Sequence, residues 1–314
     1  MKNETIRKLL AINDTFYSKH ALAFDRTRRA PWPGFERVLA TIKSETEAKA
    51  ETEAKAETEA KAETEAKAEA ETTGERDPNA KQSIAPTPVP RILDVGCGNG
   101  RFAHAAFDHF PAAHYLGLDA SASLLLAAEA ALQAKVAAGQ AILKHANVVD
   151  ACAWSTATGN DYFDLIVLFG LLHHIPSFAA RLTLIERAAD RLAPRGVLAL
   201  SFWAFDARRA VPLAALDAAL DAAASDIDAN DLEPGDVLLP WDVGGAYRYC
   251  HLADDREIDR VADALVTSHK LRSLDRFRSD GRSGDANTYL LFAKTRDTGL
   301  SDPDETESIA GSVL

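Results

Sequence analysis

The sequence feature that most constrains the fold is the stretch RILDVGCGNG at residues 91–100. Its apolar half predicts a short strand buried on both faces of a sheet. Glycine then occupies every second position from 96 to 100, which lets the backbone turn sharply and approach a ligand, because no Cβ is in the way. The residues from Arg101 onward predict a helix, whose first turn offers free N–H groups to a polar or negatively charged partner. Strand, glycine turn and helix in this order predict a nucleotide-binding turn.

The residues around this turn indicate which nucleotide it binds. Dinucleotide-binding proteins space their glycines as G-x-G-x-x-G, whereas the third glycine here comes one residue early and Asp94 precedes the turn. A carboxylate at that position favours a cation over a phosphate. Residues 115–119 predict a second strand ending in Asp119, nineteen residues after Gly100, where an acid can accept hydrogen bonds from both ribose hydroxyls. A cationic amino-acid tail joined to an adenosine ribose describes S-adenosylmethionine (SAM).

These residues resemble the first motif of the class I SAM-dependent methyltransferases. The resemblance implies an α/β, Rossmann-like sheet that is mostly parallel with an antiparallel last strand, a helical N-terminal lid and an inserted helical cap. Asn147 follows the third predicted strand, where this kind of fold usually has an Asp against the adenine amino group, and an Asn carbonyl can accept the same hydrogen bond. The expected cofactor is SAM, and its expected contacts are Asp94, Gly96, Gly98, Gly100, Asp119, Asn147 and Phe169.

Composition divides the chain into four segments. Residues 45–68 are four copies of ETEAKA, which carry no apolar stripe and therefore cannot build a core. Their Glu–Lys pairs, four residues apart, predict a partly helical, solvent-exposed spacer. We expect a helical lid at 1–44, the repeat and a proline-rich linker at 45–90, the methyltransferase domain at 91–294 with a cap insertion at 206–250, and a disordered acidic tail at 295–314.

The net charge of −12 is concentrated outside the expected catalytic domain. The repeat and the tail hold most of it, which leaves a nearly neutral body that neither supports nor excludes RNA as a partner. The three cysteines, Cys97, Cys152 and Cys250, form no CxxC pair and suit a reducing compartment. The N-terminus lacks the apolar core of a signal peptide, and no apolar run is long enough to cross a bilayer. We therefore expect a cytoplasmic protein with no membrane partner.

The segment at residues 24–33, FDRTRRAPWP, is rich in cations and ends in a tryptophan between two prolines. It lies between two stretches with helical spacing, at residues 5–12 and 35–42. One interpretation is a solvated loop with Trp32 packed on the edge of the domain. The other, which we favour because functional residues concentrate on loops, is a lid that covers SAM and brings an arginine to a carboxylate.

Residues that face the transferred methyl are expected after the fourth predicted strand, at 162–169, because ligands lie beyond the carboxyl ends of parallel strands. The next segment, GLLHHIPS, has two adjacent histidines, which cannot both face one pocket unless the backbone turns. On its own, His173 is expected to be the structural one, capping a helix or bonding a carbonyl. The spacing of His and Cys predicts no metal site. The candidates near the methyl are His173, His174, Arg28, Trp203, Tyr247, Arg248, Tyr249 and His251.

A narrower resemblance rests on five blocks: FDRTRRAPWP at 24–33, LDVGCGNG at 93–100, LLHH at 171–174, PGDVLLPW at 234–241 and YRYCH at 247–251. Together they resemble the tRNA wobble-uridine methyltransferases, which esterify 5-carboxymethyluridine, and their microbial relatives. The resemblance implies tRNA as a partner, and eukaryotic members are helped by a small accessory protein. It implies that Arg28 and Trp32 shape the lid, and that His174 and Arg248 hold the acceptor carboxylate.

We expect catalysis to depend on His174, Arg248 and Arg28, and substrate binding on Trp32, Trp203, Tyr247, Tyr249 and His251. Three hypotheses for the function remain open at this point. The first is methyl ester formation on tRNA, and the second is methyl transfer to a small carboxylic acid or another metabolite. The third is a SAM-binding regulator or partner-dependent subunit, which the intact acids and glycines of the cofactor site disfavour.

Overall fold

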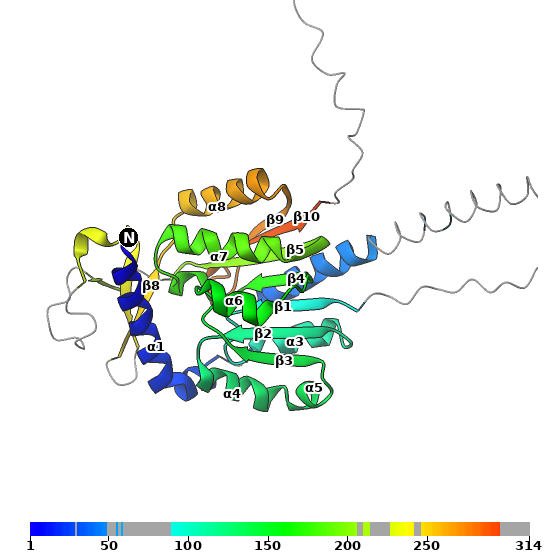
Figure 1. The fold of residues 1–314 in the computed structure, drawn as a ribbon, viewed down its shortest axis with the longest axis horizontal. Coiled ribbons are helices and arrows are strands. Elements are labelled where there is room, and N and C mark those ends of the chain that lie inside the picture. Colours follow the sequence, from blue (N-terminus) through cyan, green and yellow to red (C-terminus); the bar gives the residue numbers. More distant parts are fainter. Residues whose placement is uncertain are drawn as a thin grey trace, which may run out of the picture.

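The structure, a computed structural model, describes residues 1–28, 30–48, 55, 58, 89–205, 210–213, 227–241 and 246–295. Its main element is a seven-stranded sheet in the order β3-β2-β1-β4-β5-β10-β9 (Figure 1). All neighbours in the first five strands are parallel, and β10 runs antiparallel between β5 and β9. The predicted sheet, with its antiparallel last strand, is therefore confirmed. The strands are β1 (Arg91–Val95), β2 (His114–Asp119), β3 (Ala141–His145), β4 (Phe163–Leu168), β5 (Leu192–Trp203), β9 (Leu271–Ser279) and β10 (Asn287–Lys294).

Helices cover both faces of this sheet and enclose two apolar layers. A helix over residues 33–48 and α3 pack against one face, and α6, α7 and α8 contribute to the layer on the other face. Alternate residues of β1 enter different layers, Ile92 one and Leu93 the other, as expected for a strand buried on both sides. The helices are α3 (Arg101–His109), α4 (Ala122–Ala131), α5 (Gln133–Ala137), α6 (Ala151–Thr158), α7 (Phe178–Asp190) and α8 (Asp255–Ser268).

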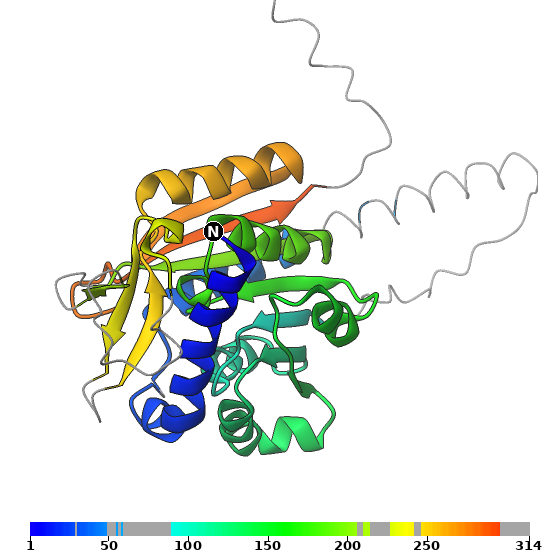
Figure 2. The same cartoon turned by 60° about the vertical axis from the view of Figure 1, so that its left-hand side comes forward.

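The N-terminal segment is helical, as predicted. Helix α1 (Asn3–Arg26) packs against α4 and β8 (Tyr247–His251), and it contributes to the lining of the cavity at the carboxyl ends of the central strands. In Figure 2 this helix runs alongside the strands of the cap. The segment that we expect to act as a lid thus begins with a long helix, whose C-terminal end leads into the cation-rich segment before the helix at 33–48.

The described part of the cap differs from the helical prediction. It forms a small antiparallel sheet of β6 (Val211–Pro212), β7 (Asp236–Pro240) and β8, preceded by a short 3-10 turn, η4 (Ala229–Asp231). The residues of these segments favour strands, because they include Val237 and the aromatic Tyr247 and Tyr249. Residues 206–209, 214–226 and 242–245 lie outside the described residues, so the prediction of helices there stays a prediction.

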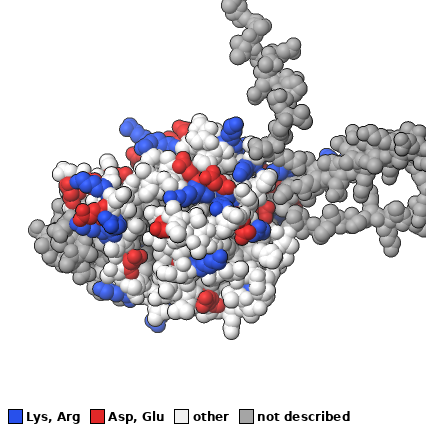
Figure 3. Space-filling view, viewed as in Figure 1, with Lys and Arg blue, Asp and Glu red and all other residues white. Residues whose placement is uncertain are grey.

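Most of the repeat and linker, at 49–88, and the acidic tail, at 296–314, also lie outside the described residues, apart from Lys55 and Thr58. Within the described part of the chain, no helix combines the length and the apolar character needed to cross a membrane. On the molecular face in Figure 3, lysine and arginine side chains are interspersed with aspartate and glutamate, and neither sign forms a continuous patch.

Candidate functional site

The glycine turn after β1 is held against the end of β2 by backbone hydrogen bonds. The N–H groups of Gly96 and Cys97 both donate to the Leu118 carbonyl, at 2.8 and 3.0 Å. The N–H of Gly98 donates to Asp119 Oδ2, and the N–H of Ser121 donates to Asp119 Oδ1, each at 2.8 Å. Burial raises the pKa of Asp119, although these N–H groups lower it in part. The carboxylate is therefore fixed in orientation at the cavity.

Two of the three glycines are required for different reasons. Gly98 has φ +54°, and a Cβ added there would meet no atom within 4 Å, so the turn leaves open space at this point. Gly100 has φ +77° and directly precedes α3, where a Cβ would lie 3.3 Å from the Ala128 Cβ. Gly98 thus leaves room for a ligand, whereas Gly100 permits close packing of α3 against α4.

Asp94 is buried near the end of β1, and its Oδ2 accepts a hydrogen bond of 2.5 Å from the Tyr115 hydroxyl. Burial raises the pKa of Asp94 to about 7, the Tyr115 hydrogen bond lowers it, and Asp119 raises it further. A cation entering the cavity would favour the charged form of this carboxyl.

These groups line a cavity of about 450 Å³ between the carboxyl ends of the central strands, α1 and the cap. Its wall is more apolar than polar, as is usual for sites that bind small molecules. Gly100 lies outside the wall, behind the turn. The predicted residues that line the cavity are Asp94, Gly96, Gly98, Asp119, Asn147, Phe169, Arg28, Trp32, His174, Trp203 and Arg248.

The two remaining predicted cofactor contacts are already engaged within the protein. Asn147 is exposed, and its Oδ1 accepts a hydrogen bond of 3.2 Å from the Val149 N–H, which leaves the oxygen one further lone pair. The Phe169 ring stacks on Phe35, with centroids 5.2 Å apart. Phe169 thus forms an apolar wall of the cavity.

Three predicted substrate-binding residues, Tyr247, Tyr249 and His251, are not among the residues that line this cavity. They alternate along β8 with Arg248, so their side chains lie on the opposite side of the strand. The Tyr249 hydroxyl donates to Asp236 Oδ1 at 2.7 Å, and His251 lies between the same oxygen and Glu257. These contacts give Tyr249 and His251 a structural role, contrary to the prediction.

His251 belongs to a buried ionic network that joins the cap to the main domain. Arg181, from α7, donates to Glu233 and to Glu257, at 2.9 and 2.8 Å. Burial lowers the pKa of His251, but its hydrogen bonds to Asp236 and Glu257 outweigh that effect and raise the pKa. Glu233, Asp236 and His251 are close enough to bind one cation. The Arg181 Nη2, 2.9 Å from His251 Nε2, disfavours a metal ion there.

Two of the arginines that line the cavity are Arg28, from the segment after α1, and Arg248, from β8. The Arg248 guanidinium is buried and lies over the Trp203 ring at 5.2 Å and the Trp241 ring at 5.7 Å. Arg28 lies over the Phe24 ring at 4.3 Å and over the same Trp241 ring at 5.1 Å. Burial lowers the pKa of Arg28 to about 10, and the charge of Arg248 lowers it further. In the described part of the chain, neither arginine forms an ion pair with a carboxylate.

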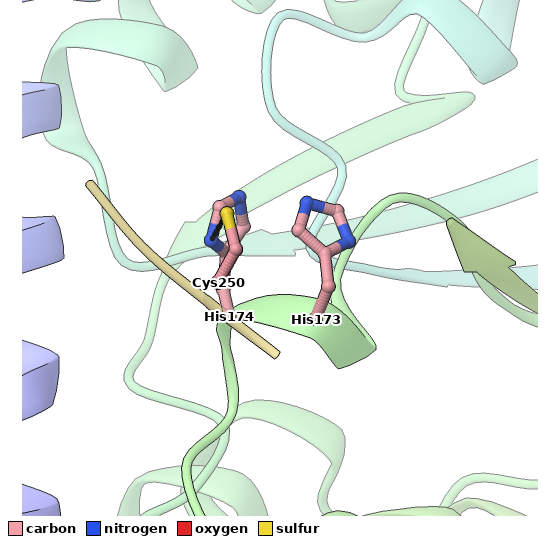
Figure 4. Close-up of side chains that lie close together, drawn as sticks. All are labelled: His173, His174 and Cys250. Atoms are coloured by element: carbon pink, nitrogen blue, oxygen red, sulfur yellow. Dashed lines mark hydrogen bonds between the residues drawn. The ribbon is translucent and has the colours of Figure 1, made fainter. Parts of the chain in front are cut away.

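The two adjacent histidines, drawn in Figure 4, make different contacts. His174, in the 3-10 turn η1 (Leu172–His174), is the one that binds a carbonyl: its Nδ1 lies 3.1 Å from the Tyr249 oxygen. Its Nε2 lies 2.8 Å from the Tyr17 hydroxyl. Burial lowers the pKa of His174 to about 3, with Arg248 contributing in the same direction. His173 instead packs edge-on against Trp203 and lines the cavity.

His173, His174 and Cys250 come close enough to be compared with a metal site (Figure 4). Burial raises the pKa of the Cys250 thiol to about 12, so the thiol is protonated at neutral pH. One nitrogen of His174 is occupied by a carbonyl, and the nearby charge of Arg248 repels cations. This donor set is therefore unsuited to zinc.

Two contacts between the lid and the main domain were not predicted. The Asn99 side chain, in the glycine turn, donates to Asp25 Oδ1 at 2.9 Å and to the Arg28 carbonyl at 3.2 Å. The Tyr17–His174 contact joins residues 157 positions apart in sequence. The only sequence signal for Tyr17 is its spacing of four residues from Asn13, a buried polar residue on the same face of α1 that also contacts His174.

The residues present fit SAM as a ligand. A fixed carboxylate at the end of β2 suits a ribose, a buried carboxyl with a pKa near 7 suits an ammonium group, and the open space at Gly98 admits the molecule between them. All three features lie within residues 93–198, the part of the chain that matches a family model.

Residues 93–198 match a family model described as a methyltransferase domain. A trans-aconitate 2-methyltransferase of Methylobacterium radiotolerans is 33% identical over 129 residues, which cover 40% of this chain and 44% of that protein. Another from Streptomyces avermitilis is 37% identical over 114 residues, which cover 36% of this chain and 39% of that protein. The chain thus matches less than half the length of these curated relatives. The tRNA substrate and the accessory protein stay predictions.

Solved structures with a similar fold include a SAM-dependent methyltransferase from Methanosarcina mazei, with a TM-score of 0.46 and 17% identity. That match covers 66% of this chain and 93% of the other. An O-methyltransferase family protein from Burkholderia thailandensis matches with a TM-score of 0.44 and 17% identity, over 66% of this chain and 52% of that protein.

Proposed function

We propose that this chain, whose residues 93–198 match a family model described as a methyltransferase domain, transfers a methyl group from SAM to a carboxylate of a small organic acid. SAM supplies an electrophilic methyl group on a sulfonium. In the proposal, Asp119 accepts hydrogen bonds from the ribose, Asp94 faces the ammonium group, and Gly98 leaves room for the ligand. Asn147 and Phe169 border the adenine.

The observation that supports a carboxylate acceptor best is the pair of arginines in the wall of the cavity. Arg28 and Arg248 share the Trp241 and Phe24 rings, and the charge of Arg248 contributes to the lowered pKa of Arg28. Two guanidinium groups this close, with no carboxylate partner in the described residues, repel each other in a partly dry site. An anionic ligand would remove that repulsion and could accept bidentate hydrogen bonds from either group.

The charge state of the histidines also supports an acceptor that needs no base. An amine or a hydroxyl must lose a proton as it is methylated, whereas a carboxylate is already an anion at neutral pH. Burial lowers the pKa of His174 to about 3 and holds the pKa of His173 well below its ordinary value. Both rings are therefore neutral, and a proton transferred to either would be repelled by Arg248 and Arg28.

Two further observations favour a small acid over RNA. Both curated relatives bear the name of an enzyme that methylates trans-aconitate, a small molecule with several carboxylates. On the one face that Figure 3 shows, charges of both signs are interspersed, whereas proteins that bind RNA usually gather cations along one path. We therefore propose a small acid with more than one carboxylate as the acceptor class.

The test is methyl transfer from labelled SAM to a panel of mono-, di- and tricarboxylic acids, followed by separation of neutral esters from the acids. We expect turnover with at least one di- or tricarboxylic acid. Arg248→Gln should raise the KM for that acid by about 100-fold, the loss of one buried charged hydrogen-bonding group, and should leave SAM affinity unchanged. Arg282→Gln, an exposed arginine in the β9–β10 hairpin, is the matched control and should behave as the wild type.

Three outcomes would overturn the proposal. If Arg248→Gln turned over the acid as fast as the wild type, the arginine pair would not be the acceptor site. If only amines or alcohols were methylated, the acceptor would not be a carboxylate. Label that enters tRNA containing carboxymethyluridine, but no small acid, would assign the chain to RNA modification.

A further inference from the structure

His173 is a buried polar residue that has no hydrogen-bonding partner in the described part of the chain. The residue is 8% exposed, and its Nδ1 is fully enclosed and has no hydrogen-bond partner. Its Nε2 also has no hydrogen bond within the described residues but is not one of the enclosed polar atoms, so Nε2 is the ring nitrogen that a ligand can reach. His173 also lines the cavity, next to Arg248 and Trp203.

The orientation of the His173 ring is fixed by packing rather than by hydrogen bonds. The ring lies edge-on to Trp203, with centroids 4.9 Å apart, and 4.0 Å from the ring of His174. His174 cannot take the role of His173, since its own nitrogens are occupied by Tyr17 and by the Tyr249 carbonyl. The two histidines therefore differ in function: one joins the lid to the cap, and the other keeps a hydrogen-bonding edge for the cavity.

The charge state of His173 determines what it can bind. Burial holds its pKa well below the ordinary value, and the neighbouring groups His174, Arg248, Arg28 and His251 lower it further. The other titratable groups close by, Tyr17 and Cys250, have raised pKa values and are also uncharged at neutral pH. A neutral imidazole offers one N–H donor and one lone pair. Its donor can contact a carboxylate oxygen without adding a third positive charge beside the arginines.

We propose that His173 is an acceptor-binding residue, whose ring N–H donates a hydrogen bond to a carboxylate of the acid, so that the arginine pair and the imidazole together orient the acceptor for methyl transfer. This inference rests on the proposed function and adds a specific residue to it. Two guanidinium groups attract an anion but leave it free to turn, whereas a third donor of fixed direction selects one orientation. His173 thus contributes to the selection among acids of similar charge.

The test compares His173→Phe and His173→Gln in the full chain, using the best acid of the wild-type panel as the probe. Phenylalanine preserves the ring that packs on Trp203 but removes the donor, and glutamine restores a donor. We expect His173→Phe to raise the KM for the acid by about 10- to 100-fold. The Kd of the acid, measured in the presence of S-adenosylhomocysteine, should rise by a similar factor. His173→Gln should recover part of that loss, and neither should change SAM affinity. His104→Phe, an exposed histidine on α3, is the control.

A second measurement uses the unchanged protein and does not depend on the folding of a variant. In protein with ¹⁵N-labelled histidine, adding the acid should shift the ring nitrogen resonances of His173 and leave those of His104 in place. Equal KM and Kd values for His173→Phe and the wild type, or ring resonances that do not shift, would overturn the assignment while the proposed function stands. If the wild type neither binds nor methylates any acid, the proposed function fails and the assignment of His173 fails with it.

Discussion

Replacing Asp94 by Asn separates the charge of this side chain from its shape, because the amide keeps an oxygen for the Tyr115 hydroxyl. Burial raises the pKa of Asp94 from 3.8 to about 7. That rise corresponds to a cost of about 4 kcal/mol for the charged form in the folded state. The pKa of Asp94 is higher in the folded state than in the unfolded state. The protonated carboxyl therefore makes its full contribution to the free energy of unfolding below about pH 4, and this contribution is lost as the pH rises through 7.

The Asn variant cannot ionise, and its stability should therefore not fall over this range. We expect the free energy of unfolding of Asp94→Asn, relative to the wild type, to increase by about 3 kcal/mol between pH 5 and pH 8. SAM affinity at pH 8 should fall by about 100-fold in the same variant, since the ammonium group loses a buried opposite charge.

Urea unfolding at the two pH values and titration calorimetry with SAM provide both quantities. Asp108→Asn, at an exposed position on α3, is the control and should change neither. A stability difference that is the same at pH 5 and pH 8, or unchanged SAM affinity, would refute the assignment of Asp94 as the buried partner of the cofactor's cation.

Three further predictions concern the lid and the cap. Arg181→Met leaves two partly buried glutamates without their arginine, and the free energy of unfolding in urea should fall by about 3 kcal/mol or more; an unchanged value would contradict the role of the network. The charge of His251 stabilises the fold fully below about pH 6.5, and this contribution is lost as pH rises through its raised pKa. Thermal unfolding of His251→Gln should accordingly depend less on pH between 6 and 9 than that of the wild type, and equal slopes would argue against it. Asn99→Ala removes two hydrogen bonds to the lid segment, so proteolysis within residues 24–33 should become faster, and SAM should slow it less than in the wild type.

The sheet, and the position at the cavity of the residues proposed to bind the cofactor, could be predicted because their signals are local in the sequence. A buried strand, a glycine turn and a carboxylate at the end of the next strand occur within thirty residues of one another in the stretch from 91 to 119. The topology of a parallel sheet then brings the ends of the strands together. Asp94, Gly98 and Asp119 lie at the cavity for that reason.

The acceptor end could be predicted only in part, because it depends on which side of a strand each residue faces. Arg248 faces the cavity, whereas Tyr249 and His251 face the ionic network, and an alternating strand has no sequence signal that says which set points inward. The roles of His173 and His174 depend on contacts with Tyr17 and with the backbone of β8, both distant in sequence. The local sequence could therefore identify the two histidines but could not show which of them contacts the backbone and which lines the cavity.

The most direct test of the central claim is the chemical nature of the methylated product. Methyl groups transferred from labelled SAM to a small acid should be released as methanol by mild alkali, because a methyl ester hydrolyses under conditions in which methyl ethers and methylamines do not. Release of the label as methanol from a di- or tricarboxylic acid is the result we predict. Label that resists alkali would contradict carboxylate methylation, and the arginine pair and His173 would then need another ligand.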